Sequence, residues 1–302
     1  MEVQAFSLYS VLMQIKQALL WGHEVLLLSS ESARLDAEIL LSYIIKKPAT
    51  FLLAHNEEEV GFLNLWRYKR LIEKRKKGVP VAYLTGHREF YFLDFAVNRH
   101  VFIPRPDTEI LVDSVISYIK NSIFPPRRAG KIQDLKLLDV GTGSGCIPIS
   151  VLKNIEGIHA VATDISRHAL HVAEKNAGKH RVLNRIHFFH SDLLASVPHS
   201  IFKGGDVIVT ANLPYIPTDF QIHPETKFEP NISLYGGGDG MDIYKAFMKQ
   251  IESIRPRAIF LELFEFQIAI LEKYLSGYSL KRTENMTGQA KMLMLERENF
   301  AE

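Results

Sequence analysis

The stretch that decides the fold is residues 136–145, which read KLLDVGTGSG. An apolar run typical of a buried strand leads into three glycines, at positions 141, 143 and 145. A glycine-rich turn that leaves a strand and opens a helix lets the backbone approach a ligand closely and turns free N–H groups toward it. The spacing differs from the G-x-G-x-x-G of a dinucleotide-binding turn, because position 146 is Cys146. The stretch therefore predicts a cofactor loop for a ligand that carries an amino-acid tail.

Acidic residues at the ends of the predicted strands supply the other cofactor contacts. Asp139 could meet the ammonium of the amino-acid tail. Asp164 lies 19 residues after Gly145, near the offset of ~20 at which an acidic residue reaches ribose hydroxyls. Asp192 could accept from an adenine amino group while Leu193 packs on the ring. The predicted cofactor-binding residues are Asp139, Gly141, Thr142, Gly143, Ser144, Gly145, Asp164, Asp192, Leu193 and Asn212.

A second motif, Asn212-Leu213-Pro214-Tyr215, lies 67 residues after Gly145. The Asn212 side-chain oxygen and a backbone carbonyl beside Pro214 could each accept one N–H of a planar target group, and Tyr215 offers a flat face. Such acceptors orient a nitrogen and stabilise the positive charge that develops on it during alkylation. We expect Asn212, Pro214 and Tyr215 to be catalytic, and all four residues to bind substrate. With the glycine loop, this clamp predicts methyl transfer from S-adenosylmethionine to an amide or amino nitrogen.

The rest of the C-terminal part alternates short apolar runs with helical segments, which is typical of a parallel α/β sheet. A final pair of strands would close the sheet with an antiparallel edge. The predicted strands are residues 136–139, 160–164, 186–189, 207–209, 258–261, 279–282 and 292–295.

The N-terminal part has helical spacing, with polar residues such as Asp36, Glu38 and Ser42 between the apolar residues Leu35, Ile39, Leu40, Tyr43 and Ile44. The sequence 78–80, GVP, is expected to end a basic helix. Residues 88–103 are rich in aromatic and β-branched side chains and predict a β-hairpin with its turn at 98–100. The predicted divisions are a helical domain (1–84), a hairpin linker (85–104) and a catalytic domain (105–302).

Composition limits the partners and the compartment. With 47% apolar residues the chain can bury a core, and a formal net charge of +2 does not by itself indicate nucleic-acid binding. Basic residues concentrate at 67–77, either as a solvated helix face or as a docking surface for RNA or an acidic partner. The single cysteine, the absence of a basic region at Met1–Gln4 and the lack of a ~20-residue apolar run favour a cytoplasmic chain without a membrane role. No third ligand accompanies the paired histidines, so no metal site is predicted.

With these residues in place, the chain resembles the bacterial release-factor glutamine methyltransferases, also called the HemK family. The resemblance rests on residues 80–86, Glu89-Phe90, 103–109, 138–145, 164–166, Ser191-Asp192, the clamp at 212–215, 228–230, Leu234 and 236–240. It implies a class I S-adenosylmethionine-dependent methyltransferase domain with a Rossmann-like seven-stranded sheet, and a small helical N-terminal domain that helps to dock the substrate. It further implies methylation of the side-chain nitrogen (N5) of the glutamine in the Gly-Gly-Gln loop of class I peptide-chain release factors.

Two departures keep alternatives open. The family usually has proline where this chain has Leu213, and the Asn-Leu-Pro-Tyr form resembles that of ribosomal RNA adenine dimethyltransferases. An adenine N6-methyltransferase of RNA or DNA is therefore the alternative, with contact to nucleic acid only through the basic residues at 67–77. Residues 261–267 lack the glycine of the family pattern, and no function is assigned to them. A ribosome-associated binding module without activity is a third interpretation, which intact Asp139, Asp164, Asn212 and Tyr215 disfavour.

Overall fold

The computed structural model describes residues 13–123, 135–202, 206–274, 276–284 and 290–298. Contacts between Cα atoms divide the chain into two units. Unit 1 comprises residues 1–86 and 223–228, and unit 2 comprises residues 87–222 and 229–302. The sequence does not indicate that the short segment 223–228 belongs with the N-terminal unit. Residues 1–12 of the predicted helical domain lie outside the described residues.

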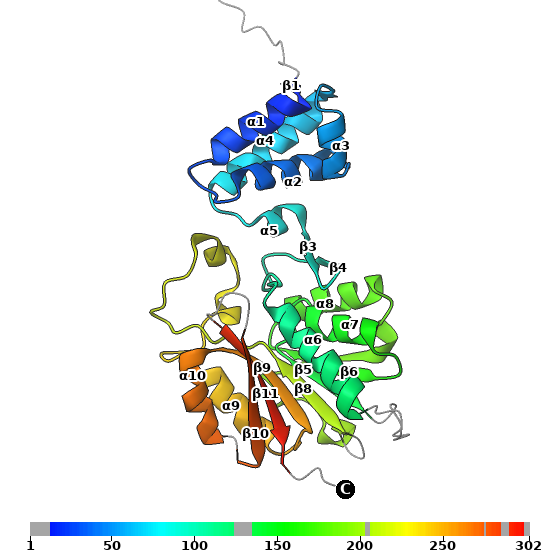
Figure 1. Cartoon of the computed structure of the whole chain (residues 1–302), viewed down its shortest axis with the longest axis vertical. Coiled ribbons are helices and arrows are strands. Elements are labelled where there is room, and N and C mark those ends of the chain that lie inside the picture. Colours follow the sequence, from blue (N-terminus) through cyan, green and yellow to red (C-terminus); the bar gives the residue numbers. More distant parts are fainter. Residues whose placement is uncertain (1–12, 124–134, 203–205, 275, 285–289, 299–302) are drawn as a thin grey trace, which may run out of the picture. The chain divides into compact units, whose positions relative to one another are not determined.

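Unit 1 is helical, as the sequence predicts (Figure 1). Its helices are α1 (Ile15–Leu26), α2 (Ala33–Ile45), α3 (Ala49–Ala54), α4 (Phe62–Lys76) and α5 (Val81–Thr85), with a 3-10 turn at Pro224–Phe228. Short strands β1 (Met13–Gln14) and β2 (Glu59–Val60) pair antiparallel. The basic helix α4 ends just before Gly78, which has a φ of +90° that a side chain would rarely adopt.

The apolar residues that mark helix α2 in the sequence are only partly buried. Leu40 is buried and Ile44 packs against the core of unit 1, whereas Leu35, Ile39 and Tyr43 are exposed. The buried residues of the helix are Ala33, Asp36, Ala37, Leu40 and Leu41, so an aspartate lies within the apolar stripe. Its partner, Arg75, explains why it is there.

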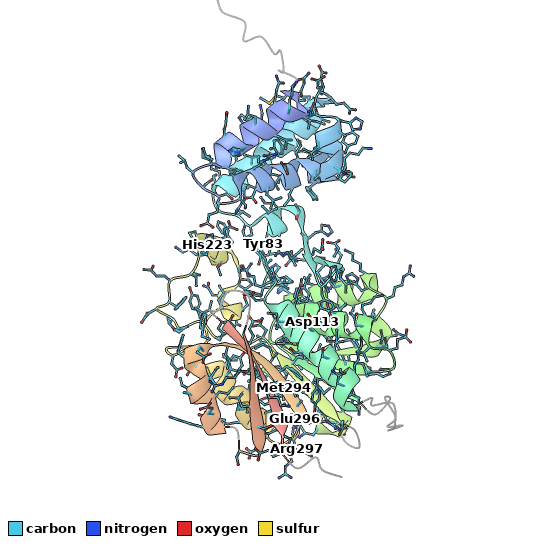
Figure 2. The ribbon with its side chains drawn as sticks, viewed as in Figure 1. Tyr83, Asp113, His223, Met294, Glu296 and Arg297 are labelled. Carbon is cyan, nitrogen blue, oxygen red and sulfur yellow. The ribbon has the colours of Figure 1, made fainter. Side chains whose placement is uncertain are left out.

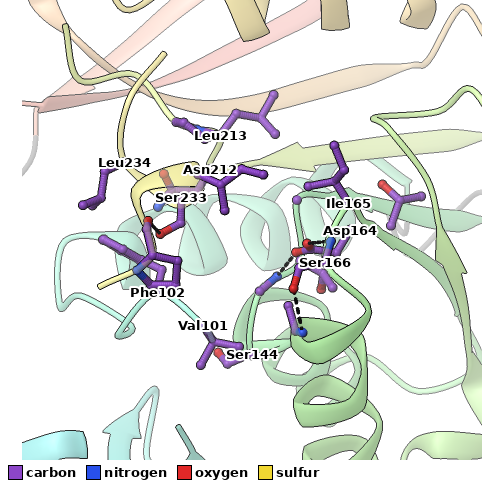
Figure 3. A pocket seen from close by; sticks show the side chains of 18 of the residues that line it. Val101, Phe102, Ser144, Asp164, Ile165, Ser166, Asn212, Leu213, Ser233 and Leu234 are labelled. Atoms are coloured by element: carbon purple, nitrogen blue, oxygen red, sulfur yellow. Dashed lines mark hydrogen bonds between the residues drawn. The ribbon is translucent and has the colours of Figure 1, made fainter. Parts of the chain in front are cut away.

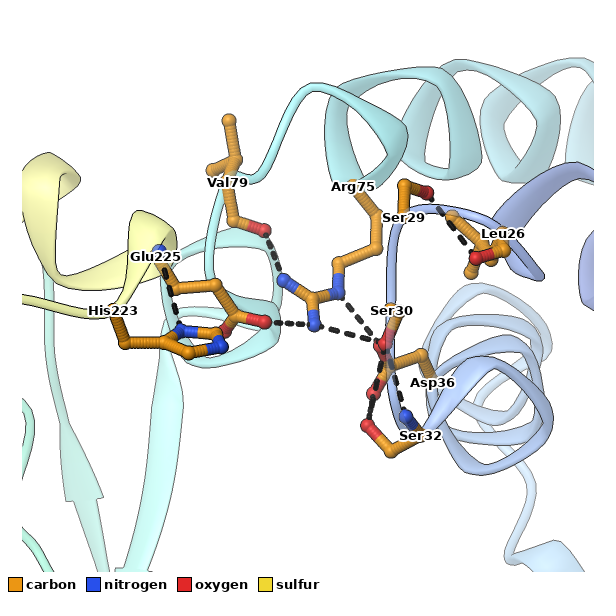
Figure 4. Close-up of polar contacts among 9 residues, drawn as sticks. All are labelled: Leu26, Ser29, Ser30, Ser32, Asp36, Arg75, Val79, His223 and Glu225. Carbon is orange, nitrogen blue, oxygen red and sulfur yellow. Dashed lines mark hydrogen bonds and ion pairs between the residues drawn. The ribbon is translucent and has the colours of Figure 1, made fainter.

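Arg75 is buried with 2% of its surface exposed, although it lies in the most basic part of the sequence. Its Nε donates to Asp36 Oδ2 (2.6 Å), and its Nη2 donates to Ser30 Oγ (3.1 Å) and to Glu225. Ser32 Oγ donates to the other Asp36 oxygen (2.9 Å), and Figure 4 shows the whole group. We call these residues (Ser30, Ser32, Asp36, Arg75 and Glu225) the Arg75 cluster. Arg75 is therefore a structural ion-pair residue and not part of a solvated or docking face.

The β-hairpin opens unit 2, with strands β3 (His87–Phe90) and β4 (Leu93–Ala96). Its turn is Tyr91–Phe92, with φ values of 51° and 58°. The turn predicted at 98–100 is present, with Val101 N–H donating to the Asn98 carbonyl (3.1 Å), but it follows the hairpin and does not connect its strands. Two hydrogen bonds to residues of the helix Thr108–Tyr118 hold this left-handed backbone. The Tyr91 N–H donates to Glu109 (2.9 Å), and the Tyr91 hydroxyl donates to Asp113 (2.6 Å; Asp113 is labelled in Figure 2). Non-glycine residues at a two-residue hairpin turn give no strong sequence signal, which explains the error.

The seven-stranded sheet of unit 2 has the order β10-β11-β9-β8-β5-β6-β7, and all seven strands were predicted. The parallel strands are β5 (Lys136–Val140), β6 (His159–Asp164), β7 (Ile186–His190), β8 (Val207–Ala211) and β9 (Ala258–Phe264). Strands β10 (Tyr278–Glu284) and β11 (Ala290–Arg297) form the predicted antiparallel edge.

Helices cover the sheet and bury two apolar clusters (Figure 1). Helices α6 (Thr108–Tyr118) and α7 (Cys146–Asn154) contribute to one cluster, together with Leu137 and Ile208 of the sheet. Helices α9 (Asp242–Ile251) and α10 (Glu265–Leu271) contribute to the other, together with Leu138 and Val209. Helix α8 (Arg167–Lys179) follows β6. Short turns of helix lie at Ile119–Ile123, Leu183–Arg185, His199–Phe202, Asn231–Ser233 and Glu272–Tyr274.

Candidate active site

A cavity of about 180 Å³ lies at the carboxyl ends of β5, β6, β7 and β8, where ligand sites of open α/β sheets are found. All of its lining residues belong to unit 2. Figure 3 shows side chains from the loops after β6 and β8 around it. Most of the predicted site residues meet here: Gly141, Thr142, Gly143, Ser144, Asp164, Asp192, Leu193, Asn212, Leu213, Pro214 and Tyr215.

The glycine loop adopts a backbone that side chains would obstruct. Gly141 has a φ of +73°, and a Cβ there would come within 2.8 Å of Leu213 Cδ2. Gly145 does not line the cavity but precedes α7 with a φ of +78°. Thr142 and Ser144 line the cavity, and their buried hydroxyls lack a hydrogen-bond partner among the described residues. Buried polar atoms are rarely left unpaired, so the loop fits a polar ligand.

Asp164 ties this loop to the next strand. Its Oδ2 accepts from Gly143 N–H (2.8 Å) and its Oδ1 accepts from Ser166 N–H (2.8 Å). Burial raises the pKa of Asp164, and the two backbone hydrogen bonds oppose that rise. Each oxygen keeps a further lone pair, so the carboxylate can accept from ligand hydroxyls.

Asp139 lies outside the set of residues that line the cavity. It is 1% exposed and does not line the cavity. Thr210 Oγ1 donates to its Oδ1 (2.6 Å), and its Oδ2 has no partner among the described residues. Burial raises the pKa of Asp139 to about 6. The direct contact of Asp139 with a ligand ammonium therefore stays a prediction, since the carboxylate is buried and outside the cavity lining.

The clamp begins directly after β8 and is held by side chains that the sequence does not point to. Asn212 Nδ2 donates to Glu262 Oε2 (3.0 Å) and to Thr108 Oγ1 (3.1 Å). The Tyr215 hydroxyl donates to Glu262 Oε1 (3.0 Å), and Gln267 Nε2 donates to the Tyr215 carbonyl (2.7 Å). Because its Nδ2 is held by Glu262 and Thr108, Asn212 keeps its carbonyl oxygen as an acceptor beside the cavity.

Leu213, the departure from the family pattern, is 3% exposed. Its side chain contacts the glycine loop near Gly141, and its N–H donates to the Tyr244 hydroxyl (3.2 Å). The difference from proline therefore falls on packing against the loop and on this hydrogen bond, because proline has no backbone N–H to donate.

Glu262 is the main residue that sequence reasoning missed. It is 8% exposed on β9, and burial raises the pKa of its carboxyl group. A single acidic residue near the carboxyl end of an apolar strand is an available signal, because such a group needs a reason to be buried. The sequence assigned no role to Glu262 because residues 261–267 lack the glycine of the family pattern.

The sheet order and the cavity at its carboxyl end define the class I S-adenosylmethionine-dependent methyltransferase fold, and S-adenosylmethionine carries an electrophilic methyl group on a positively charged sulfur. The family described as "PrmC N-terminal domain" matches residues 17–86, and that described as "Methyltransferase small domain" matches residues 126–215. The unpartnered loop hydroxyls and the Asp164 carboxylate fit this cofactor.

Curated relatives identify the family. A release factor glutamine methyltransferase of Clostridium acetobutylicum is 37% identical over 237 residues, covering 77% of this chain and 79% of that protein. A bifunctional methyltransferase of Rickettsia felis is 35% identical over 292 residues, covering 87% of this chain and 54% of that protein, so the chain spans about half of that relative's length. The chain belongs to the release factor glutamine methyltransferase family.

Solved structures support the fold alone. The hMettl16 catalytic domain, in complex with a hairpin of the MAT2A 3′UTR, is 15% identical with a TM-score of 0.54, covering 87% of this chain and 93% of that chain. A human methyltransferase 10 domain containing protein is 17% identical with a TM-score of 0.50, covering 69% of this chain and 90% of that chain. No helix in the described parts of the chain is long and apolar enough to cross a membrane.

Proposed function

We propose that this protein transfers a methyl group from S-adenosylmethionine to the side-chain nitrogen of a glutamine in class I peptide-chain release factors, in the Gly-Gly-Gln loop. The observation that carries the proposal is the state of Asn212, whose side-chain nitrogen Nδ2 donates to Glu262 and Thr108. Its carbonyl oxygen is left to accept an N–H of the target amide. The names of the curated relatives supply the substrate class. A cytoplasmic location is part of the proposal.

The clamp would compensate for the weak nucleophilicity of an amide. Asn212 Oδ1 and a backbone carbonyl near Pro214 would hold the two N–H groups of the target nitrogen, while Tyr215 packs beside its plane. A new C–N bond forms as the methyl–sulfur bond breaks, and the nitrogen later gives one proton to solvent. Acceptors fixed before the reaction stabilise the positive charge that develops on the nitrogen.

For the cofactor, we assign Asp164 to the ribose hydroxyls and Asp192 with Leu193 to the adenine. The glycine loop, with Thr142 and Ser144, would hold the amino-acid tail. Asp164, Thr142 and Ser144 support this assignment by lining one cavity with acceptor or hydroxyl groups.

Adenine N6 remains the second candidate, because the same acceptors suit an exocyclic amino group. The sequence clue for it was Leu213, and the buried side chain of this residue gives that clue less weight. The basic helix face is the only further support; on it Arg70 lies over the Trp66 ring at 4.7 Å and Lys69 over Trp21 at 5.4 Å. Nucleic-acid contact through this face therefore has less support than a peptide substrate.

The test is transfer of a labelled methyl group to a purified class I release factor. A release factor whose Gly-Gly-Gln glutamine is replaced serves as the matched control, and ribosomal RNA and DNA are assayed in parallel. We expect label on the intact factor only. Label on nucleic acid with none on the factor would replace the proposal by its alternative.

A further inference from the structure

Glu262 is a buried carboxylate whose side-chain partners, within the described residues, are Asn212 and Tyr215 of the clamp and Thr108 of α6. It lies in β9, in the sequence AIFLELF, between Leu261 and Leu263, which are fully buried. Three uncharged groups donate to its two oxygens: Thr108 Oγ1 (2.9 Å) and Asn212 Nδ2 (3.0 Å) to Oε2, and the Tyr215 hydroxyl (3.0 Å) to Oε1. No cation within the described residues forms an ion pair with it.

The arrangement fixes the direction of every hydrogen bond around it. Thr108, Asn212 and Tyr215 each donate to its oxygens, which is the pattern that an ionised carboxylate requires, because it has no hydrogen to donate. Thr108 Oγ1 uses its hydrogen on Glu262 and accepts from Asn212 (3.1 Å). The Asn212 amide would lose these bonds if it turned over, because its carbonyl oxygen would then face two oxygens.

The backbone around Glu262 is fixed separately from its side chain. The Tyr244 hydroxyl donates to the Glu262 carbonyl (2.7 Å) and accepts from Leu213 N–H (3.2 Å). Gln267 holds the Tyr215 carbonyl (2.7 Å). A change confined to the Glu262 carboxylate therefore leaves the supports of the strand and of the clamp backbone in place.

We propose that Glu262 is a positioning residue that sets the polarity of the clamp: as an acceptor-only anion it directs Asn212 Nδ2 away from the substrate, so that the clamp presents acceptors to the target nitrogen. This inference rests on the proposed function for its catalytic consequence. The inferred orientation of Asn212 is independent of the proposed function, because it is a property of the free protein.

Glu262→Gln tests the role with little change of shape. The glutamine amide brings two hydrogens to a position where three donors already converge, so at least one bond must be lost or turned over. We expect kcat to fall about 10- to 100-fold, as for the loss of a hydrogen bond to a charged group, while KM for the release factor changes less than about threefold. Glu262→Asp, which keeps the anion on a shorter side chain, should retain more of kcat than Glu262→Gln.

The matched control is Glu296→Gln on the neighbouring strand β11 (Glu296 is labelled in Figure 2). Glu296 also accepts from a tyrosine hydroxyl, that of Tyr118 (3.2 Å), and it does not line the cavity. The kcat of the Glu296→Gln variant should stay within about twofold of the value for the unaltered protein. A kcat for Glu262→Gln within about threefold of the parent, or an equal loss in both variants, would overturn the proposal.

A second measurement keeps the proposal testable if Glu262→Gln does not fold or if the release factor is not the substrate. Hydrogen exchange of the Asn212 side-chain amide is followed by NMR in the unaltered protein labelled with ¹⁵N-asparagine, with Asn212→Ala used to assign the signal. We expect exchange about 10- to 100-fold slower than for the exposed Asn154 amide. Exchange as fast as that of Asn154 would overturn the role of Glu262, whatever the substrate proves to be. Slow exchange together with an inactive protein would contradict the proposed function alone.

Discussion

The Arg75 cluster of unit 1 and the Glu262 site of unit 2 both bury a charge, but they neutralise it differently. Arg75 contacts two carboxylates, Asp36 and Glu225, so its charge is compensated by opposite charge. Within the described residues, the groups that donate to Glu262 are uncharged, and burial raises the pKa of its carboxyl group. Compensated charge is what a structural network needs, whereas a carboxylate kept without a cation costs stability and is typical of functional sites.

The first prediction concerns the structural side of this comparison and has the largest expected effect. Arg75→Met should lower the free energy of unfolding of unit 1 by about 3–5 kcal/mol, because Asp36 is left buried without its cation. The two tryptophans, Trp21 and Trp66, both lie in unit 1, so denaturation followed by tryptophan fluorescence reports on it.

Arg70→Met, on the exposed side of the same helix, is the control and should cost less than about 1 kcal/mol. Affinity for S-adenosylhomocysteine should be unchanged in both variants, since the cavity is lined by unit 2 alone. Equal effects of the two substitutions would remove the distinction between a buried structural cation and a surface one.

The second prediction concerns the functional side. Asn212→Ala should reduce kcat about 10²–10³-fold, as for the loss of one preorganised acceptor in the transition state. Thermal unfolding should change little by comparison. Asn154→Ala at the end of α7 is the control, since Asn154 bonds only the local Ser150 carbonyl (2.8 Å). Near-normal turnover of Asn212→Ala would exclude this residue from the mechanism.

The third prediction concerns Asp164, the carboxylate assigned to the cofactor, whose role differs from those of the buried charges Arg75 and Glu262. Asp164→Ala should weaken S-adenosylhomocysteine binding by about 1.5–3 kcal/mol, the value of hydrogen bonds to a charged group. Calorimetry measures this, with Asp113→Ala as an acidic control outside the cavity. An affinity that is the same in both variants would refute the assignment of Asp164 to the ribose.

The last prediction is a change in pH dependence at Asp139. Its pKa rises from 3.8 to about 6 on folding, so the folded state binds the proton more tightly. The stability from this residue is fully present below about pH 4 and is lost as pH rises through about 6, with a slope of up to about 1.4 kcal/mol per pH unit. Asp139→Asn should abolish that slope. Parallel unfolding free energies of the two proteins between pH 4 and 7 would show that Asp139 does not titrate there.

The sheet could be predicted from sequence because buried parallel strands are short apolar runs, and each of the seven was found. The cofactor loop and the clamp were equally visible, since glycine and proline motifs act locally. Glu262 and Arg75 were not, because their environment is made by residues distant in sequence: Thr108 lies 154 positions from Glu262, and Glu225 lies 150 positions from Arg75. Local patterns do not show which buried charge will meet an opposite charge.

The measurement that tests the central claim most directly is tandem mass spectrometry of the Gly-Gly-Gln peptide from a class I release factor incubated with the enzyme and S-adenosylmethionine. The account predicts one added methyl group on the glutamine side chain with the unaltered protein, and a strongly reduced amount with Asn212→Ala. An unmodified glutamine after incubation with a folded enzyme that binds S-adenosylhomocysteine would contradict it.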